Sequence, residues 1–242
     1  MKTLSILPPN KTRTFYSPLY SKLVRTGVIG DGSCLLHALY YAISQEYKSL
    51  SLSERVVFIS NVREKLASRL SLADIKSLGR GELFKMIFML FLREVLSQQS
   101  LQDWDHWDNV ILVEISNTFD PSTIESTLQK EAPHLKCIGL VDAIEQRILE
   151  QLQQKMQYEW VDDFCLEYLS RVYERNFLFI KADDRLSYKV FQAKEYASSV
   201  VFCWIEESHY EIIGELQNDL RVLRDFPSDH PFIQAINMKL EK

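Results

Sequence analysis

The stretch VIGDGSCLLHALYYAI, residues 28–43, is the most informative part of this sequence. The whole chain holds only seven glycines, yet Gly27, Gly30 and Gly32 fall within six residues, just before an apolar helical pattern. Glycine adopts backbone conformations that other residues avoid and lets neighbouring groups approach the main chain closely. The stretch therefore predicts a tight loop that leads into a helix, with Cys34 at the helix N-terminus.

A glycine loop before a helix can direct several backbone N–H groups at one point, which suits a phosphate or an oxyanion beside a nucleophile. The phosphate use fits poorly, because no lysine follows the loop and GDGSC lacks the glycine spacing of dinucleotide-binding loops. A thiol at a helix N-terminus feels the positive end of the helix dipole, which stabilises the reactive thiolate. Cys34 is therefore a candidate nucleophile, and a buried packing residue is the alternative.

A cysteine nucleophile needs a base, and His209 is the best placed of the histidines. It opens the segment HYEII after a strand pattern, SVVFCWI, and a short turn. Side chains alternate along a strand, so Glu211 points to the same face and can hold the imidazole in one tautomer. His37 lies on the same short helix as Cys34. The remaining histidines fall in predicted loops: His106, His134 and His230.

The composition is that of a globular protein and excludes some partners. The chain has 242 residues, of which 46% are apolar and 25% charged, with a net charge of -5. An acidic chain offers no basic surface to nucleic acid, so we expect no nucleic-acid partner. The most apolar run, residues 83–96, carries three charged side chains and is shorter than the about 20 residues that cross a bilayer. We expect a buried helix here, or an exposed partner-binding helix, and no membrane association.

The cysteines are scattered and form no CxxC pair, and no histidine cluster accompanies them at the spacing of zinc ligands. This pattern favours reduced thiols in a reducing compartment. We therefore expect no metal, no cofactor and a cytoplasmic location.

Helical patterns fill the first two thirds of the chain, and strand patterns fill the last third. Helices are predicted over residues 34–47, 51–70, 79–96, 120–130, 141–160 and 160–173, and strands over 176–182, 187–192, 199–205 and from 209 onward. A capping box at Ser51 and Glu54 marks one helix start, and Asp120 marks another. This order predicts an α+β fold, with an irregular N-terminal arm over residues 1–26 and a helical insertion over residues 71–156.

Three stretches together resemble the ovarian-tumour (OTU) family of cysteine proteases. GDGSCLLHAL, residues 30–39, is similar to the cysteine box of this family, G-D-G-x-C-L-[FY]-x-[AS], with Leu36 in place of the usual aromatic residue. SHYEII, residues 208–213, is similar to the histidine box, H-[YF]-[DNE]. QYEWVDDFCLEYLSRVYERNFLFI, residues 157–180, resembles the middle helix and the strand after it.

The resemblance implies a papain-like OTU fold, in which a small mixed β-sheet packs against helices. Residues 27–242 would form one catalytic domain, with an enlarged helical insertion after the cysteine helix. Such an insertion would fit a bacterial effector or a large-virus protein, and the location would then be the host cytosol.

The same resemblance implies a deubiquitinase, whose partner is ubiquitin or a polyubiquitin chain. The reaction would be hydrolysis of the isopeptide bond at the C-terminal glycine of ubiquitin, through an acyl-enzyme thioester. Cys34 would be the nucleophile and His209 the general base and then acid. Glu211 would orient the imidazole, with Asp31 as the alternative acid.

Further residues would shape the substrate site. Asp31, with the amides of Gly32, Ser33 and Cys34, would form the oxyanion pocket. The C-terminal tail of ubiquitin is basic, so Glu206 and Glu207 are candidates to meet its arginines, and turn residues in water are the alternative. Trp204 is a candidate contact to the narrow tail, and packing within the sheet is the alternative.

Three functions of other classes are also compatible with the sequence. A papain-like amidase or acyltransferase would use the same thiol on a small molecule. A catalytically silent scaffold would keep the fold and bind ubiquitin without cleaving it. A helical adaptor would use the central helices to bind another protein.

Overall fold

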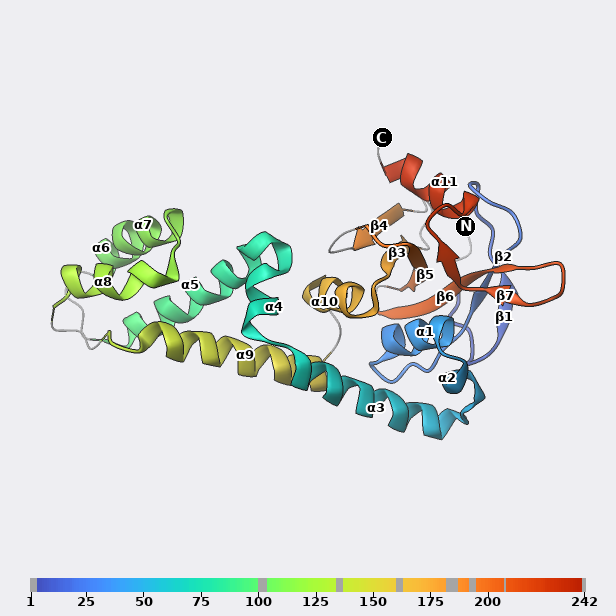
Figure 1. Ribbon diagram of the computed structural model, residues 1–242, viewed down its shortest axis with the longest axis horizontal. Coiled ribbons are helices and arrows are strands. Elements are labelled where there is room, and N and C mark those ends of the chain that lie inside the picture. Colours follow the sequence, from blue (N-terminus) through green and yellow to red (C-terminus); the bar gives the residue numbers. More distant parts are fainter. Residues whose placement is uncertain are drawn as a thin grey trace. The chain divides into compact units, whose positions relative to one another are not determined.

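The computed structural model describes residues 4–99, 104–133, 137–159, 163–181, 187–191, 195–206 and 208–240. The chain divides into two compact units (Figure 1). The sheet unit comprises Met1–Lys65 and Tyr158–Lys242, and the helical unit comprises Leu66–Gln157. No helix among the described residues is both long enough and apolar enough to cross a membrane.

A mixed β-sheet forms the centre of the sheet unit. The described strands are β1 (Thr12–Thr14), β2 (Leu23–Thr26), β3 (Asn176–Lys181), β4 (Ser187–Phe191), β5 (Ser198–Ile205), β6 (His209–Leu216), β7 (Val222–Leu223) and β8 (Asp225–Pro227). The strand order is β1-β2-β6-β5-β3-β4, with β7 paired to β6 and β8 paired to β5. Strands β3 and β5 run parallel, and the other pairs are antiparallel. Helices and a mixed sheet in one chain make this an α+β fold, as the sequence predicts.

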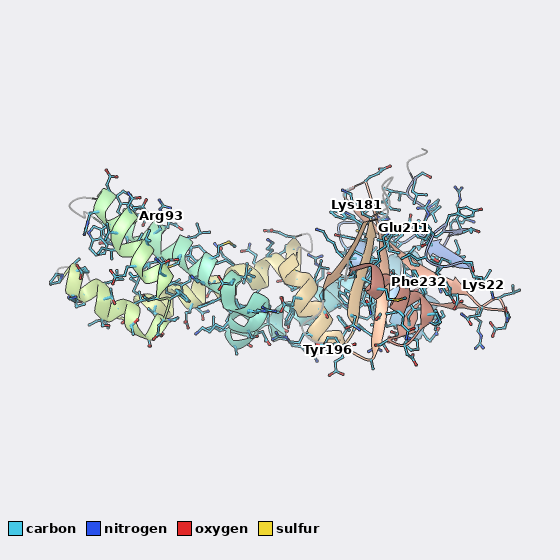
Figure 2. The ribbon with its side chains drawn as sticks, turned by 90° about the horizontal axis from the view of Figure 1, so that it is seen from above. Lys22, Arg93, Lys181, Tyr196, Glu211 and Phe232 are labelled. Carbon is cyan, nitrogen blue, oxygen red and sulfur yellow. The ribbon has the colours of Figure 1, made fainter. Side chains whose placement is uncertain are left out.

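Alternating apolar residues build a core on one face of this sheet. Leu178 of β3, Val201 and Cys203 of β5 and Ile213 of β6 are all buried in it. Helix α11 (Pro231–Leu240) packs on this core through residues one turn apart, including Phe232 (Figure 2). The sequence predicted the strands but only a short terminal segment in place of α11.

The β5–β6 hairpin positions the histidine and confirms the predicted strand–turn–strand. His209 pairs with Ile205, and Glu211 pairs with Cys203. Because paired residues of an antiparallel ladder share a face, His209 and Glu211 project from the same side of the sheet. Trp204 alternates with Ile205 along β5 and therefore projects from the other side.

Helix α1 (Cys34–Ile43) follows the glycine loop and contacts β6 and β5. The prediction of one helix over residues 34–47 is wrong, because the helix stops before Ser44. Ser44 takes an extended backbone, and its hydroxyl accepts a hydrogen bond from the Tyr47 N–H, so that it caps a new helix, α2 (Gln45–Ser49). Serine side chains favour such caps over helix interiors.

The irregular arm predicted over residues 1–26 is also wrong in part, because β1 and β2 lie inside it. Strand β2 is buried at each of its four residues and pairs with β6, whose residues lie far away in the sequence. Before β1, the chain crosses closely over Gly27. A Cβ atom at that position would lie 2.4 Å from the carbonyl oxygens of both Leu7 and Pro8, so only glycine fits.

Two long helices carry the chain between the units. They are α3 (Leu52–Arg69) and α9 (Leu140–Tyr158). The capping box predicted for α3 is confirmed, since the Ser51 N–H donates to Glu54 Oε2 at 2.8 Å and the Glu54 N–H donates to Ser51 Oγ at 3.4 Å. Helix α10 (Asp163–Tyr173) contacts β3 and β4, and residues 160–162, with the predicted Trp160, lie outside the described residues.

The helical unit holds the remaining elements. They are α4 (Leu72–Ser77), the short 3-10 turn η1 (Leu78–Gly81), α5 (Glu82–Ser97), α6 (Trp104–His106), the π-helical turn η2 (Trp107–Ile111), α7 (Leu112–Asn117) and α8 (Pro121–Glu131). His106 is therefore helical, so the loop predicted for it is wrong. Asp120 caps α8 as predicted, accepting from the Ser122 N–H at 3.0 Å. Helix α5 buries one face, including Phe88 and Leu92, and exposes another.

Candidate active site

Cys34 and His209 line the same pocket in the sheet unit. Cys34 is the first residue of α1, and His209 is the first residue of β6. The pocket has a volume of about 430 Å³, and its walls come from the N-terminal segment, the glycine loop and the hairpin: Ile6, Leu7, Pro8, Pro9, Val28, Gly30, Gly32, Cys34, Ser208 and His209. The structure thus places Cys34 and His209, the two residues that the sequence singled out, in one pocket, although they lie far apart in the sequence.

The thiol of Cys34 is buried, with 2% of the residue exposed. Its Sγ lies 4.0 Å from the carbonyl oxygen of Ser208. Burial raises the pKa of Cys34, while hydrogen bonding from the backbone N–H groups of Tyr210 and Leu35 opposes that rise and Asp31 adds to it. The helix N-terminus and β6 therefore supply donors that favour the thiolate, but burial outweighs them and the pKa of Cys34 is raised.

The imidazole of His209 faces the glycine loop. A Cβ atom built on Gly30 would lie 3.6 Å from both Nδ1 and Cε1 of His209, so this edge of the ring packs against the loop. His209 is 5% exposed, and its Nε2 is buried and has no hydrogen-bond partner among the described residues. Burial lowers the pKa of His209, and nearby Glu206 acts in the opposite direction. A neutral imidazole at pH 7 is the form that can accept a proton.

These two pKa shifts predict a neutral resting pair, and alkylation of Cys34 tests this. A raised thiol pKa moves the thiolate to higher pH, and a neutral imidazole does not stabilise it. We expect the rate of iodoacetamide addition at Cys34 to rise with pH and to have a higher midpoint than in the urea-unfolded chain. The rate is measured by peptide mass spectrometry. A native midpoint below that of the unfolded chain would instead indicate a resting thiolate–imidazolium pair.

Glu211 is fully buried, but its carboxylate does not bind His209. Its Oε2 pairs with Arg25 Nη1 at 2.8 Å, and its Oε1 accepts the Leu7 N–H at 2.6 Å. Arg25 Nη2 donates further to the Ser5 carbonyl at 2.8 Å. The hydrogen bond expected between Glu211 and His209 is absent among the described residues, because both carboxylate oxygens hold β2 and the N-terminal segment to β6.

Asp31 does not bind His209 either. Its Oδ1 accepts the Ser33 N–H at 2.9 Å, and its Oδ2 lies 3.0 Å from Nε2 of His37. His37 is fully buried, and its Nδ1 lies 2.5 Å from the Tyr47 hydroxyl. Arg63 Nη1 donates to the Ser33 hydroxyl at 3.2 Å. This network fixes the glycine loop onto α1, and it uses the Ser33 N–H that was expected in the oxyanion pocket.

Trp204 lies away from the Cys34–His209 pocket. Its ring stacks against Tyr210, with the centroids 6.3 Å apart. The ammonium groups of Lys181 and Lys189 lie 5.2 and 5.8 Å from the same ring. Two cations already cover this aromatic face, so the placement favours packing over contact with a basic peptide tail.

The acidic candidates next to the histidine are only partly described. Glu206 is an exposed turn residue with a φ of 50°, and its charge acts on the pKa of His209. Glu207 lies outside the described residues. Among the described residues no cluster of three or more His, Cys, Asp or Glu side chains is arranged to hold a metal ion.

Sequence reasoning missed the residues that support the site. Arg25 and Leu7 lie in the predicted irregular arm, and His37 was considered only as a neighbour of Cys34. Only the β-branched and apolar character of LVRT, residues 23–26, signalled a strand there. The partners of these side chains depend on the pairing of β2 with β6, and no local sequence pattern indicates that pairing.

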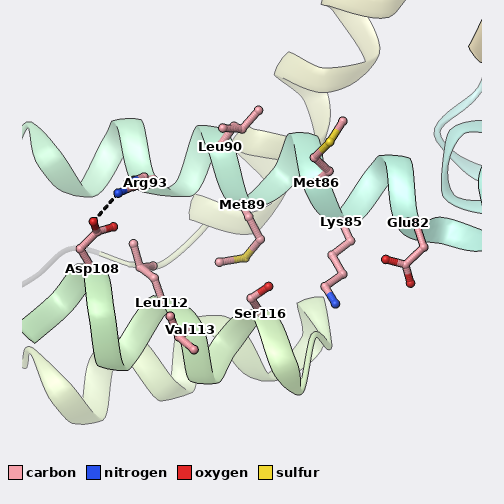
Figure 3. Close-up of a pocket in the computed structure, with 10 residues that line it drawn as sticks. All are labelled: Glu82, Lys85, Met86, Met89, Leu90, Arg93, Asp108, Leu112, Val113 and Ser116. Atoms are coloured by element: carbon pink, nitrogen blue, oxygen red, sulfur yellow. Dashed lines mark hydrogen bonds and ion pairs between the residues drawn. The ribbon is translucent and has the colours of Figure 1, made fainter.

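The helical unit has hollows of its own that carry no such chemistry. One groove of about 410 Å³ lies between α5 and the η2–α7 segment (Figure 3). Met86 and Leu90 of α5 line it and are 56% and 59% exposed. An ion pair between Arg93 and Asp108 closes one end. The helix over residues 83–96 is thus buried on one face, as expected, and exposed on this one, and no cysteine or histidine lines the groove among the described residues.

Comparison with known proteins gives similarity at the level of structure. Neither a protein-family model nor a curated protein sequence matches the chain. The structure is similar to that of an ovarian tumour (OTU) domain in complex with ubiquitin, with 12% sequence identity, a TM-score of 0.44, and coverage of 96% of this chain and 90% of that chain. It is also similar to the OTU domain of OTUD1, with 13% identity, a TM-score of 0.34, and coverage of 79% of this chain and 85% of that chain.

Proposed function

We propose that this chain is a cysteine-type deubiquitinase of the OTU class. Its substrate would be ubiquitin, or a polyubiquitin chain, joined through its C-terminal glycine to a lysine. The observation that carries the proposal is the pocket in which a helix-terminal thiol, Cys34, and a buried neutral imidazole, His209, lie together. The cysteine and histidine boxes at residues 30–39 and 208–213 support the same class.

Acylation begins with proton transfer inside this pocket. His209 removes the proton from Cys34 Sγ as the sulfur attacks the carbonyl carbon of the terminal glycine, and a C–S bond forms. The carbonyl oxygen becomes an oxyanion. The Ser33 N–H is already bonded to Asp31, so the donors left in the loop are the amides of Gly32 and Cys34. The C–N bond then breaks, and imidazolium returns its proton to the leaving lysine amine.

Deacylation repeats the sequence with water. His209 takes a proton from a water molecule, whose oxygen attacks the thioester carbonyl. The C–S bond breaks, the protonated imidazole returns the proton to sulfur, and ubiquitin leaves with a free C-terminal carboxylate. The base needs a fixed ring, and Glu211 acts as a positioning residue here. It anchors β6 to β2 and to the wall formed by Leu7, without a hydrogen bond to the imidazole.

Incubation with diubiquitins of every linkage tests the proposal. We expect the wild type to cleave one or more linkages and Cys34→Ala to cleave none, because Cys34 is the cysteine that lines the pocket with His209 among the described residues. Cys137→Ala is the matched control, since Cys137 is an equally buried thiol in the helical unit. Cleavage of no linkage by the wild type, with ubiquitin bound equally by Cys34→Ala, would favour a silent scaffold. Cleavage of small amides alone would favour a thiol amidase.

A further inference from the structure

Basic side chains gather around the ring of Tyr41 in the sheet unit. The guanidinium carbon of Arg55 lies 5.3 Å from the centroid of the Tyr41 ring, and that of Arg224 lies 5.0 Å from the same centroid. Arg55 Nη2 also donates to the carbonyl oxygen of Lys48 at 2.7 Å. Residues from α1, α2, α3 and the β7–β8 junction therefore converge at one place.

These cations have only neutral partners. In the described part of the chain no carboxylate forms an ion pair with Lys48, Arg55 or Arg224. Arg55 donates to the carbonyls of Tyr47 and Lys48 and to the side-chain oxygen of Asn10; Arg224 donates to the Thr26 hydroxyl and the Val222 carbonyl; Lys48 Nζ reaches the Ala42 carbonyl at 3.5 Å.

Arg224 has a donor without an acceptor. Its Nε is buried and has no hydrogen-bond partner among the described residues. An unpaired buried donor destabilises the folded chain, and more so when it is charged. Burial lowers the pKa of Arg224, and burial together with Arg224 lowers the pKa of Lys48, so both cations are held where their charge is disfavoured. The Tyr41 ring offers a negative face but no full charge.

We propose that Lys48, Arg55 and Arg224 form a binding site for a phosphate-bearing anion. A guanidinium presents paired N–H groups that match phosphate oxygens, and an ammonium adds a mobile charge beside them. Arg55 is buried, while Lys48 and Arg224 are half-buried. Two sources supply this chemistry: a free phosphate or inositol phosphate, and the headgroup of a phosphoinositide lipid.

Calorimetric titration of the full chain tests the site. We expect saturable binding of inositol 1,4,5-trisphosphate and weaker binding of inorganic phosphate. Lys48→Gln and Arg224→Lys should each weaken binding at least about tenfold, because each removes a charge-assisted hydrogen bond or the guanidinium fork. The matched control is Arg221→Gln, which removes one positive charge from an exposed side chain nearby in the sequence and should bind as the wild type does.

Further measurements distinguish a free phosphate from a lipid headgroup and test whether binding at this site is independent of Cys34. Sedimentation with phosphatidylcholine vesicles, with and without phosphatidylinositol 4,5-bisphosphate, distinguishes a lipid headgroup from a free phosphate. Cys34→Ala should bind the phosphates as the wild type does, whatever its activity. The proposal is overturned if the wild type binds neither phosphate nor vesicles. It is also overturned if Lys48→Gln and Arg224→Lys, both folded by circular dichroism, bind as the wild type does, or if Arg221→Gln weakens binding equally.

Discussion

Cys34→Ala is expected to abolish diubiquitin hydrolysis, and His209→Ala is expected to lower kcat/KM by about 10²–10⁴-fold. The first variant lacks the sulfur that forms the thioester. The second keeps the sulfur, but its thiol, whose pKa is raised by burial, loses the one histidine that lines the pocket among the described residues. Initial rates of cleavage, measured on the linkage that the wild type cleaves fastest, give both effects.

Matched substitutions show whether these effects belong to the pocket. Cys137→Ala removes an equally buried thiol, and His106→Ala removes an exposed imidazole, both in the helical unit. Each is expected to keep wild-type rates. Loss of activity in His106→Ala equal to that in His209→Ala would contradict the assignment of the base.

Arg25→Ala is expected to lower the free energy of unfolding by about 3–5 kcal/mol, the usual cost of breaking a buried ion pair. Both side chains of the pair are almost inaccessible, at 4% and 0% exposure. Without Arg25, the Leu7 N–H is the one hydrogen-bond partner left to the Glu211 carboxylate among the described residues. Urea denaturation followed by circular dichroism measures the change.

The pH dependence of this loss has a defined sign. Burial already raises the pKa of Glu211, with the Leu7 N–H and Arg25 opposing it, and removal of Arg25 raises it further. A carboxyl whose folded pKa exceeds its unfolded pKa costs stability as pH rises through that interval. The loss in free energy of unfolding caused by Arg25→Ala should therefore be smaller at pH 5 than at pH 8. Arg221→Ala, which breaks an exposed pair with Asp219, should change the free energy of unfolding far less at either pH, because water screens this pair. Equal losses in the two variants would contradict this account.

The sequence predicted the parts of the site that local patterns specify. The glycine run before an apolar helix placed Cys34 at a helix N-terminus, and an apolar strand with a short turn placed His209 at the start of β6. Both depend on backbone preferences that operate over a few residues. Period-two alternation also placed His209 and Glu211 on one face, as the register of the β5–β6 pair shows.

Alternation does not reveal which partner a side chain on that face will meet. Glu211 binds Arg25 and Leu7, which lie 186 and 204 residues away in the sequence. These partners come from a region that looked irregular because its strands are short: β1 pairs with β2, and β2 pairs with the distant β6. Tertiary pairing of this kind overrides weak local propensity. Asp31, by contrast, binds two neighbours in the sequence, the Ser33 N–H and His37, and the candidate base His209 is not its partner among the described residues.

Reaction with a ubiquitin whose C-terminus carries a propargyl amide tests the pairing of Cys34 and His209 most directly, because the alkyne reports the attacking sulfur without needing a particular linkage. Intact-mass and peptide analysis should show one ubiquitin attached to the wild type, through Cys34, with labelling lost in Cys34→Ala and greatly slowed in His209→Ala. A wild-type chain that forms no adduct, or that is labelled at Cys137, Cys165 or Cys203, would contradict the account.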